Sequence, residues 1–206
     1  MTAMKIQALP LAILLTGCVA VEQPVAPKPF ANQVVSFTPG QGATYGQDKM
    51  PGVVLGPPNG GGPLAGSLDV VSLGKDGTIV LALEESVVDG PGVDLIVFEN
   101  PFPGWLETGY VAVSEDGNIW HEFPCDPLDK AHDFPGCAGV HPVLANAENG
   151  VDPTDPVRAG GDDFDLADLG VKSAKYVRIR DSGFNPYAPP TGGFDLDAVA
   201  VVHAAQ

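Results

Sequence analysis

The chain has 206 residues, of which 44% are hydrophobic and 17% charged, and it contains 26 glycines, 21 prolines and a formal net charge of −16 at pH 7. This turn-rich composition favours many short strands over long helices, and the length suits one all-β domain with a substantial core. The acidic excess argues against a nucleic-acid partner, because phosphate binding needs clustered lysine and arginine. It suits calcium binding and is equally compatible with the solubility of a surface protein.

Residues 1–17 predict a signal peptide that is absent from the mature protein. One lysine, Lys5, precedes the apolar run Ala8–Leu15, which is far too short to span a bilayer. The sequence LTGC resembles a bacterial lipobox, and the resemblance implies cleavage before Cys18 and lipidation of its thiol. Val19 stands where an inner-membrane retention aspartate would be, which favours the outer membrane and the cell surface. The alternative is a plain signal peptide with an incidental cysteine.

Residues 18–30 are predicted to tether a folded domain to the lipid. Pro24, Pro27 and Pro29 recur there among small residues without an apolar period, which is typical of an extended, semi-rigid segment. Residues 31–206 are then expected to form a single domain. Removal of residues 1–17 takes away one lysine and no acidic residue, so the formal charge of the mature chain is −17.

Alternating and β-branched runs between Gly, Pro and Asp clusters predict the strands of this domain. They are expected at Val34–Phe37, Asp69–Leu73, Thr78–Leu83, Asp94–Phe98, Tyr110–Ser114, Trp120–Phe123, Tyr176–Asp181 and Leu196–His203. Asp76-Gly77 and Asp116-Gly117 lie between strand-like runs and indicate hairpins, because glycine accepts the positive φ of such turns. The segment FDLADLG is expected to form at most one short helical turn, ended by Gly170.

Two long connections, Gly40–Gly66 and Pro124–Lys175, are expected to be binding surface, packed loops or disorder. The second contains Cys125 and Cys137, an even pair in an exported chain once Cys18 carries lipid, and we expect them to form a disulfide. A metal pair is the weaker alternative, because the spacing matches no zinc pattern.

Two segments resemble discoidin-type domains. VAVSEDGNIWHEF, at Val111–Phe123, is similar to their strand, Asp-Gly turn and tryptophan, and AKYVRIRD, at Ala174–Asp181, is similar to a later strand. Most of Val53–His203 also resembles a group of uncharacterised bacterial cell-surface lipoproteins. These resemblances imply a galactose-binding-like β-jelly-roll sandwich of about eight strands with long loop insertions. They do not name a ligand.

Acidic side chains are the candidate calcium ligands, because calcium takes six to eight oxygens. An EF-hand is excluded, since counting from Asp163 places alanines at the fifth and twelfth positions. The candidates are Asp94 and Glu99 at either end of a predicted strand, Asp163 and Asp165 in the second insertion, and Asp195 and Asp197 in the last strand.

The last pair is the most informative of these candidates. Asp195 and Asp197 are expected to project from one face of a strand, where they repel each other unless a cation or solvent lies between them. Similarity to calcium-binding jelly rolls favours Asp197 and then Asp195 as ligands. Alternatively, both line a solvated edge or accept hydrogen bonds from a turn. In GGDDFDLADLG, Asp162 or Asp163 could equally cap a short helix.

Candidate contacts for an organic ligand are Asn100, Trp105 and Tyr187. Asn100 follows a predicted buried strand, where loops converge, and the two rings lie in Pro- and Gly-rich loops that suit stacking on a sugar. The alternatives are a turn set by Asn100 before Pro101 and rings that pack beneath their own loops.

The chain has no Gly-x-Ser-x-Gly elbow, no His-Glu-x-x-His motif and no phosphate-binding glycine fingerprint. Glutamates that could act in glycoside hydrolysis are present, but nothing singles out a pair among Glu84, Glu85, Glu99, Glu107 and Glu122. We therefore predict a non-catalytic, calcium-stabilised module of a cell-surface lipoprotein that presents loops to a glycan or a surface protein. The alternatives are a carboxylate-based glycan-active enzyme and a metal-free structural or adhesion protein.

Overall fold

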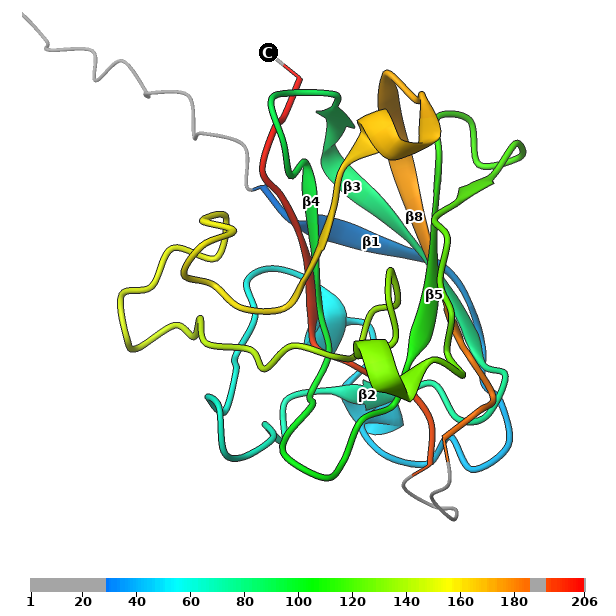
Figure 1. The fold of residues 1–206 in the computed structure, drawn as a ribbon, viewed down its shortest axis with the longest axis vertical. Coiled ribbons are helices and arrows are strands. Elements are labelled where there is room, and N and C mark those ends of the chain that lie inside the picture. The colour runs from blue at the N-terminus through cyan, green and yellow to red at the C-terminus, as the bar shows by residue number, and fades with distance from the viewer. Residues whose placement is uncertain (1–28, 186–191, 206) are drawn as a thin grey trace, which may run out of the picture.

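The computed structural model describes residues 29–185 and 192–205, and it is built of antiparallel β-sheets with almost no helix (Figure 1). The predicted all-β class is confirmed. Cys18 and Tyr187 lie outside the described residues. Within the described part of the chain, no helix has the length and apolar character needed to cross a bilayer.

The larger layer is a five-stranded sheet in which every neighbouring pair is antiparallel. Its order is β1 (Ala31–Thr38), β3 (Thr78–Val88), β8 (Ser173–Asp181), β5 (Gly109–Ser114) and β6 (His121–Glu122). Along β8, Ala174, Val177 and Ile179 are fully buried while their neighbours reach the outer surface. This alternation is typical of a sheet with one face in the core and the other in solvent.

The smaller layer is a three-stranded sheet that is covered on both faces. Its order is β10 (Ala198–Val201), β4 (Leu95–Phe98) and β7 (Asp162–Phe164). On one face, Leu95, Val97 and Val199 join the core of the larger sheet, so the two layers form a β-sandwich.

The opposite face of the smaller sheet carries Phe98 and Ala200. The connection around Val143–Ala159 packs over it, and this connection is the yellow loop in Figure 1. Burial on both sides explains why LIVF and AVAV are continuous apolar runs with no alternation.

A short pair of strands extends the smaller layer toward one end of the sandwich. β2 (Val71–Ser72) pairs with β9 (Asp195–Leu196), and only Asp197 separates β9 from β10. The strand predicted at Leu196–His203 thus corresponds to the end of β9 and to β10, with an interruption at Asp197.

The two predicted hairpins have different outcomes. The Asp116-Gly117 turn joins β5 to β6, which pair as expected. The Asp76-Gly77 hairpin is wrong, because β2 pairs with β9 while β3 pairs with β1 and β8. That turn instead carries the chain from one layer to the other, with Asp76 at a φ of 62°.

The long connections contain the remaining elements. The first holds two 3-10 turns, η1 (Gln47–Lys49) and η2 (Gly52–Val54). The second holds η3 (Lys130–His132), the unpredicted strand β7, and η4 (Leu166–Leu169), which ends at Gly170 as predicted. The predicted disulfide between Cys125 and Cys137 is confirmed and encloses η3.

Candidate functional site

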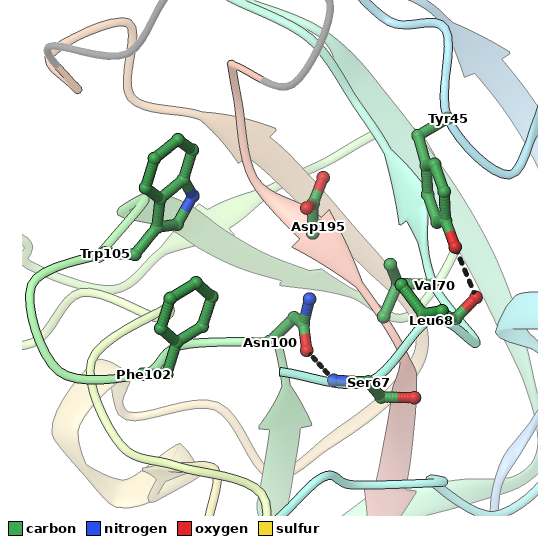
Figure 2. A pocket seen from close by; sticks show the side chains of 8 residues that line it. All are labelled: Tyr45, Ser67, Leu68, Val70, Asn100, Phe102, Trp105 and Asp195. Atoms are coloured by element: carbon green, nitrogen blue, oxygen red, sulfur yellow. Dashed lines mark hydrogen bonds between the residues drawn. The ribbon is translucent and has the colours of Figure 1, made fainter. Parts of the chain in front are cut away.

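A pocket of about 240 Å³ lies where β4 and β9 meet the first long connection (Figure 2). It combines aromatic, aliphatic and polar side chains, with both an amide and a carboxylate among its walls. Its lining residues are Tyr45, Ser67, Leu68, Val70, Asn100, Phe102, Trp105 and Asp195. Asn100 and Trp105 were predicted as ligand contacts, and the structure brings both to this pocket.

A tight turn positions two of the aromatic rings. The sequence Phe102-Pro103-Gly104-Trp105 closes on itself through two backbone hydrogen bonds, Phe102 N to Trp105 O at 3.2 Å and Trp105 N to Phe102 O at 2.8 Å. Proline followed by glycine at a φ of 87° suits such a turn. The turn sets the Phe102 and Trp105 rings nearly parallel, with centroids 6.1 Å apart.

The opposite wall is built around the backbone carbonyl of Leu68. The Tyr45 hydroxyl donates to this oxygen at 2.9 Å, and the Lys49 ammonium donates to it at 2.8 Å. Leu68 itself is 75% exposed, so an apolar surface faces solvent at the pocket rim. An aromatic ring held in place beside an accessible apolar side chain is typical of a ligand-binding wall.

Asn100 forms the base of the pocket. Its Oδ1 accepts from the backbone N–H of Ser67, which leaves Nδ2 as a donor (Figure 2). Gly66 permits this approach, because a Cβ there would lie 2.5 Å from Asn100 Oδ1. Asn100 therefore does more than set a turn before Pro101, because its side chain also joins two loops through Ser67.

Asp195 belongs both to the pocket and to a group of three carboxyl groups. The other members are Glu99 and Glu107, and one carboxylate oxygen from each of the three lies within 4.8 Å of the others. Glu99 follows β4, Glu107 precedes β5, and Asp195 begins β9. Strands from both layers thus bring together residues that are far apart in sequence.

Protein donors satisfy only part of this acidic group. Glu107 accepts from the Gly193 N–H at 2.7 Å through Oε1 and from Trp105 Nε1 at 3.1 Å through Oε2. Glu99 Oε1 accepts from the backbone N–H of Asp195 at 3.1 Å. Gly193 has a φ of 118°, and a Cβ there would lie 2.6 Å from the Gly74 backbone, so glycine is required where this N–H meets Glu107.

Three buried side-chain oxygens lack a hydrogen-bond partner among the described residues, and all three lie at this place. They are Glu99 Oε2, Asp195 Oδ1 and Ser72 Oγ. Ser72 is directly opposite Asp195 in the β2–β9 pair, so its hydroxyl and the Asp195 carboxylate face each other and interact without a well-formed hydrogen bond, whereas Glu99 Oε2 has no protein donor beside it. Buried polar atoms without partners are uncommon because each costs free energy. Together with the three neighbouring carboxylates, these oxygens could hold a metal ion.

The environment of the three carboxyl groups opposes negative charge. Burial raises the pKa of Glu99 well above its usual value, and the charges of Asp195 and Glu107 add to the effect. Burial also raises the pKa of Glu107 to about 8, with Asp195 as the next cause. The pKa of Asp195 rises to about 6 through burial, while the Ser72 hydroxyl acts in the opposite direction. A proton or a cation must therefore compensate these charges.

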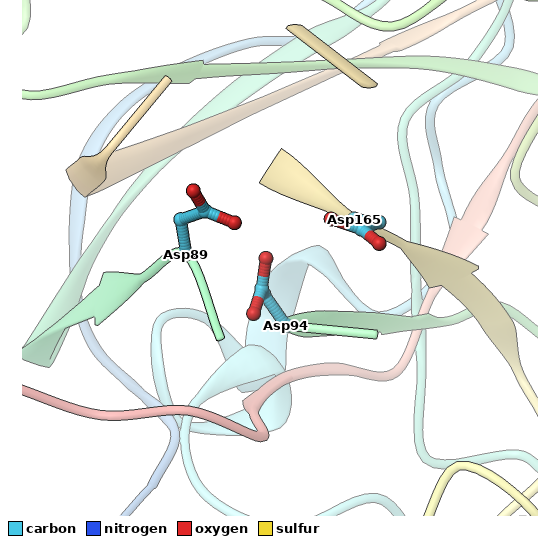
Figure 3. A group of neighbouring side chains, drawn as sticks. All are labelled: Asp89, Asp94 and Asp165. Atoms are coloured by element: carbon cyan, nitrogen blue, oxygen red, sulfur yellow. The ribbon is translucent and has the colours of Figure 1, made fainter. Parts of the chain in front are cut away.

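A second acidic group, Asp89, Asp94 and Asp165, lies at the other end of β4 (Figure 3). Asp94 is fully buried, but protein donors occupy both of its oxygens. Oδ1 accepts from the Gly90 N–H at 2.8 Å and contacts His203 Nδ1 at 2.7 Å, and Oδ2 accepts from the Leu166 N–H at 2.8 Å.

The two other members of the second group also have protein partners. Asp89 forms an ion pair with Lys172, and Asp165 caps η4 by accepting from the Ala167 N–H at 2.8 Å. The cap expected at Asp162 or Asp163 is thus supplied by Asp165. This group holds segments of the chain together and could also hold an ion, but among the described residues it has no buried oxygen without a partner, unlike the group around Glu99.

The structure places Asp163 and Asp197 outside both groups. Asp163 is exposed and lines a wider recess of about 630 Å³ with Asp126, Asp168 and the disulfide loop. Both oxygens of Asp197 accept from the Asn59 N–H at 3.0 Å, and burial raises the pKa of Asp197 to about 8. Of the six predicted calcium ligands, only Glu99 and Asp195 share one group with unpartnered oxygens.

Several residues of the site were not predicted. Glu107 stood among five glutamates that nothing in the sequence separated, and it lies two residues before β5. Tyr45 and Phe102 were not predicted because their loops have no apolar periodicity that would place their side chains. The Phe-Pro-Gly-Trp sequence was an available signal, since a Pro-Gly turn brings its flanking residues together.

No protein-family model matches the chain, and no curated protein sequence matches it either. A function for this chain is therefore inferred from the pocket and the carboxyl groups beside it.

Proposed function

We propose that this protein is an exported, lipid-anchored and non-catalytic β-jelly-roll module that is stabilised by Ca²⁺ and binds a saccharide. The observation that carries the proposal is the pocket in which Trp105, Phe102 and Tyr45 surround Asn100 and Asp195. Aromatic faces pack against the C–H surfaces of a sugar ring, while an amide donor and a carboxylate acceptor bind its hydroxyl groups. A cavity of about 240 Å³ suits one sugar residue of a larger glycan.

The Glu99–Glu107–Asp195 group is the best-supported calcium site. Its donors are all oxygens, which a hard cation prefers, and two of them have no partner. A bound cation would neutralise carboxylates that burial and mutual repulsion otherwise oppose. Three carboxylates leave coordination positions for other oxygens, because calcium takes six to eight.

Burial of the two glutamates supports a binding role over catalysis. Glu99 and Glu107 are only 2% and 1% exposed, and neither lines the pocket. An acid or nucleophile of a glycoside hydrolase must touch the scissile bond. Asp195 alone would reach a bound sugar, so the paired carboxylates of such an enzyme are not both accessible. Turnover of a polysaccharide that is abolished by Glu107→Gln would contradict this proposal.

The position of the pocket suits a protein anchored at its N-terminus. The described chain begins beside β10, where Val201 N donates to Pro29 O at 2.7 Å. Asp195 lies six residues earlier along β9 and β10, which corresponds to roughly 20 Å of extended chain. The described chain thus enters the sandwich at the end away from the pocket, so an anchor that precedes this entry point would leave the pocket facing outward.

Antiparallel pairing throughout and the five-on-three arrangement support the jelly-roll assignment. The segments that resemble discoidin domains fall on β5, β6 and β8 of the larger sheet. A lipid-anchored sandwich with an outward pocket fits a role at the cell surface.

Saccharide binding is tested with the Cys18→Ser chain, which keeps the whole folded part. We expect one or more methyl glycosides of hexoses, hexosamines or uronic acids to bind in calorimetry with calcium present. Trp105→Ala should weaken binding at least tenfold, because it removes a stacking surface. Trp120→Ala is the matched control, since Trp120 packs against Arg178 and does not line the pocket. Equal effects of both substitutions, or no binding at all, would refute the saccharide assignment.

Lipidation is tested separately by mass spectrometry of the N-terminal peptide and by detergent partitioning. The wild-type chain should begin at Cys18 and carry acyl chains, whereas Cys18→Ser should be released in soluble form. A Cys18→Ser protein that is still acylated and membrane-bound would overturn this part of the proposal.

A further inference from the structure

We infer that the cation held by Glu99, Glu107 and Asp195 sets the conformation of the neighbouring pocket, so that ligand binding depends on the cation. This inference rests on the proposed function, but it assigns the cation a second role besides stabilising the fold. It is carried by three separate connections between the acidic group and the pocket walls.

The first connection is Asp195, which belongs to both places. Its Oδ1 is buried without a partner, while the residue lines the pocket between Trp105 and Tyr45 (Figure 2). A cation bound through Asp195 would fix the carboxylate in one orientation. The pocket would then present a positioned acceptor to a ligand hydroxyl, which reduces the ordering cost of binding.

The second connection is the hydrogen bond from Trp105 Nε1 to Glu107 Oε2 at 3.1 Å. The indole plane is one wall of the pocket, and its N–H is attached to a ligand of the proposed cation. A shift of the Glu107 carboxylate toward a cation therefore moves or restrains the stacking surface itself.

The third connection runs through the backbone from Glu99 to Asn100. Glu99 Oε1 accepts from the Asp195 N–H at 3.1 Å, and its Oε2 has no partner. Asn100 comes next in the chain and supplies the amide at the base of the pocket. The side chain that would bind the cation and the side chain that would bind the sugar thus share one short stretch of backbone after β4.

Repulsion among three desolvated carboxylates explains why the cation should matter. Without a cation, the three groups can lie this close only with protons bound, because like charges at these separations oppose the compact arrangement of β4, β9 and the segment before β5. A divalent cation reverses the sign of this interaction and draws the same groups together. Because coupling between two sites is reciprocal, a sugar that prefers the ordered pocket must tighten cation binding by the same factor.

Trp105 offers a direct readout of this coupling that needs no sugar. The chain has two tryptophans, so the Cys18→Ser/Trp120→Phe chain reports Trp105 fluorescence alone. After treatment with EDTA and its removal, calcium chloride should produce a saturable change in emission, because the partner of the indole N–H becomes a metal ligand. Glu99→Gln should abolish the change without touching Trp105. Asp163→Asn, an acidic residue outside the group, should leave it intact.

Calorimetry then separates this inference from the proposed function. For a methyl glycoside that binds, calcium should tighten the sugar at least fivefold, and the sugar should tighten calcium by the same factor. Equal sugar affinity with calcium and with EDTA would overturn the inference while leaving saccharide binding in place. A calcium-induced change at Trp105 without binding of any glycoside would support the cation link and refute the saccharide. Calcium binding in calorimetry with unchanged Trp105 emission would overturn the inference.

Discussion

Asp195 and Asp197 lie two residues apart, yet their carboxylates meet different surroundings. Asp195 joins Glu99 and Glu107 and keeps one oxygen without a partner, whereas both oxygens of Asp197 face the Asn59 N–H at 3.0 Å. The strand is interrupted between β9 and β10 at Asp197, so a shared cation between the two aspartates is not required to relieve their repulsion. The two aspartates, close together in the sequence, thus have two different environments in the structure.

Calcium should therefore stabilise the protein through Asp195 and not through Asp197. At a free calcium concentration of one hundred times the dissociation constant, the free energy of unfolding should rise by about 2.7 kcal/mol. For a domain of this size that corresponds to a rise of roughly 5–10 °C in the unfolding midpoint. Thermal unfolding in EDTA and after restoring calcium measures the shift. Asp195→Asn should lose the response.

Asp197→Asn is the matched control, because it is the same substitution two residues away. It should keep the calcium response. If Asp197→Asn lost the response and Asp195→Asn kept it, the cation would lie elsewhere and the role of the Glu99–Glu107–Asp195 group would be wrong.

Asp197 should instead make stability depend on pH. Its pKa is raised by burial to about 8 from an ordinary 3.8, so between these values the folded state holds a proton that the unfolded state has released. The free energy of unfolding then falls as pH rises, by at most about 1.4 kcal/mol per pH unit, until pH passes the folded pKa. Asp197→Asn keeps an acceptor oxygen for Asn59 and removes this dependence.

Chemical denaturation in EDTA at pH 5, 7 and 9 tests the assignment. The other raised carboxyl groups add slopes of the same sign, so the informative quantity is the difference between wild type and Asp197→Asn. The free energy of unfolding of Asp197→Asn should increase relative to that of the wild type as pH rises. A difference that stays constant from pH 5 to pH 9 would show that Asp197 does not carry the proton.

The all-β class could be predicted from the sequence because most strands have a local signal. LIVF, YVAVS and YVRIRD are apolar or alternating runs bounded by turn residues, and each became a strand. β7 was missed because DDF is short and polar, and its partner β4 lies far away in sequence. The Asp76-Gly77 turn shows the same limit, since a turn signal does not reveal which sheet the next strand joins.

The acidic site was less accessible to sequence reasoning because convergence depends on register. Ala198 is paired with Phe98, and continuing that antiparallel pairing one step places Glu99 opposite Asp197, two residues from Asp195. The Glu99–Asp195 contact departs from this register, because the Asp195 N–H reaches Glu99 Oε1 beyond the interruption of the strand at Asp197, 96 positions away in sequence. Glu107 enters from a loop with no period at all. Asp94 resembled Glu99 in sequence, but donors from Gly90, Leu166 and His203 occupy both oxygens of Asp94, and none of these donors could be foreseen from its local sequence.

The disulfide should stabilise the second long connection. Cys125 and Cys137 are separated by 12 residues, and closing a loop of this size restricts the unfolded chain by about 3 kcal/mol. Cys125→Ser/Cys137→Ser in the Cys18→Ser background should lower the free energy of unfolding by that order in chemical denaturation. Reductant should lower wild-type stability similarly and leave the double variant unchanged. Calcium stabilisation should persist, since the disulfide lies outside the Glu99–Glu107–Asp195 group; its loss would tie the two features together.

Asp94 should act as a structural clamp that is indifferent to calcium. Its buried carboxylate receives the Gly90 and Leu166 N–H groups and contacts His203 Nδ1, and it thereby joins β4 to η4 and to the chain after β10. Asp94→Asn turns one acceptor into a donor that faces another donor, so we expect a loss of roughly 3 kcal/mol in the free energy of unfolding. The loss should be equal in EDTA and in calcium. His203→Ala should cost less, because the His203 side chain is partly exposed and both backbone donors keep their acceptor. If Asp94→Asn were as stable as wild type in EDTA and failed to respond to calcium, the Asp89–Asp94–Asp165 group would be the cation site.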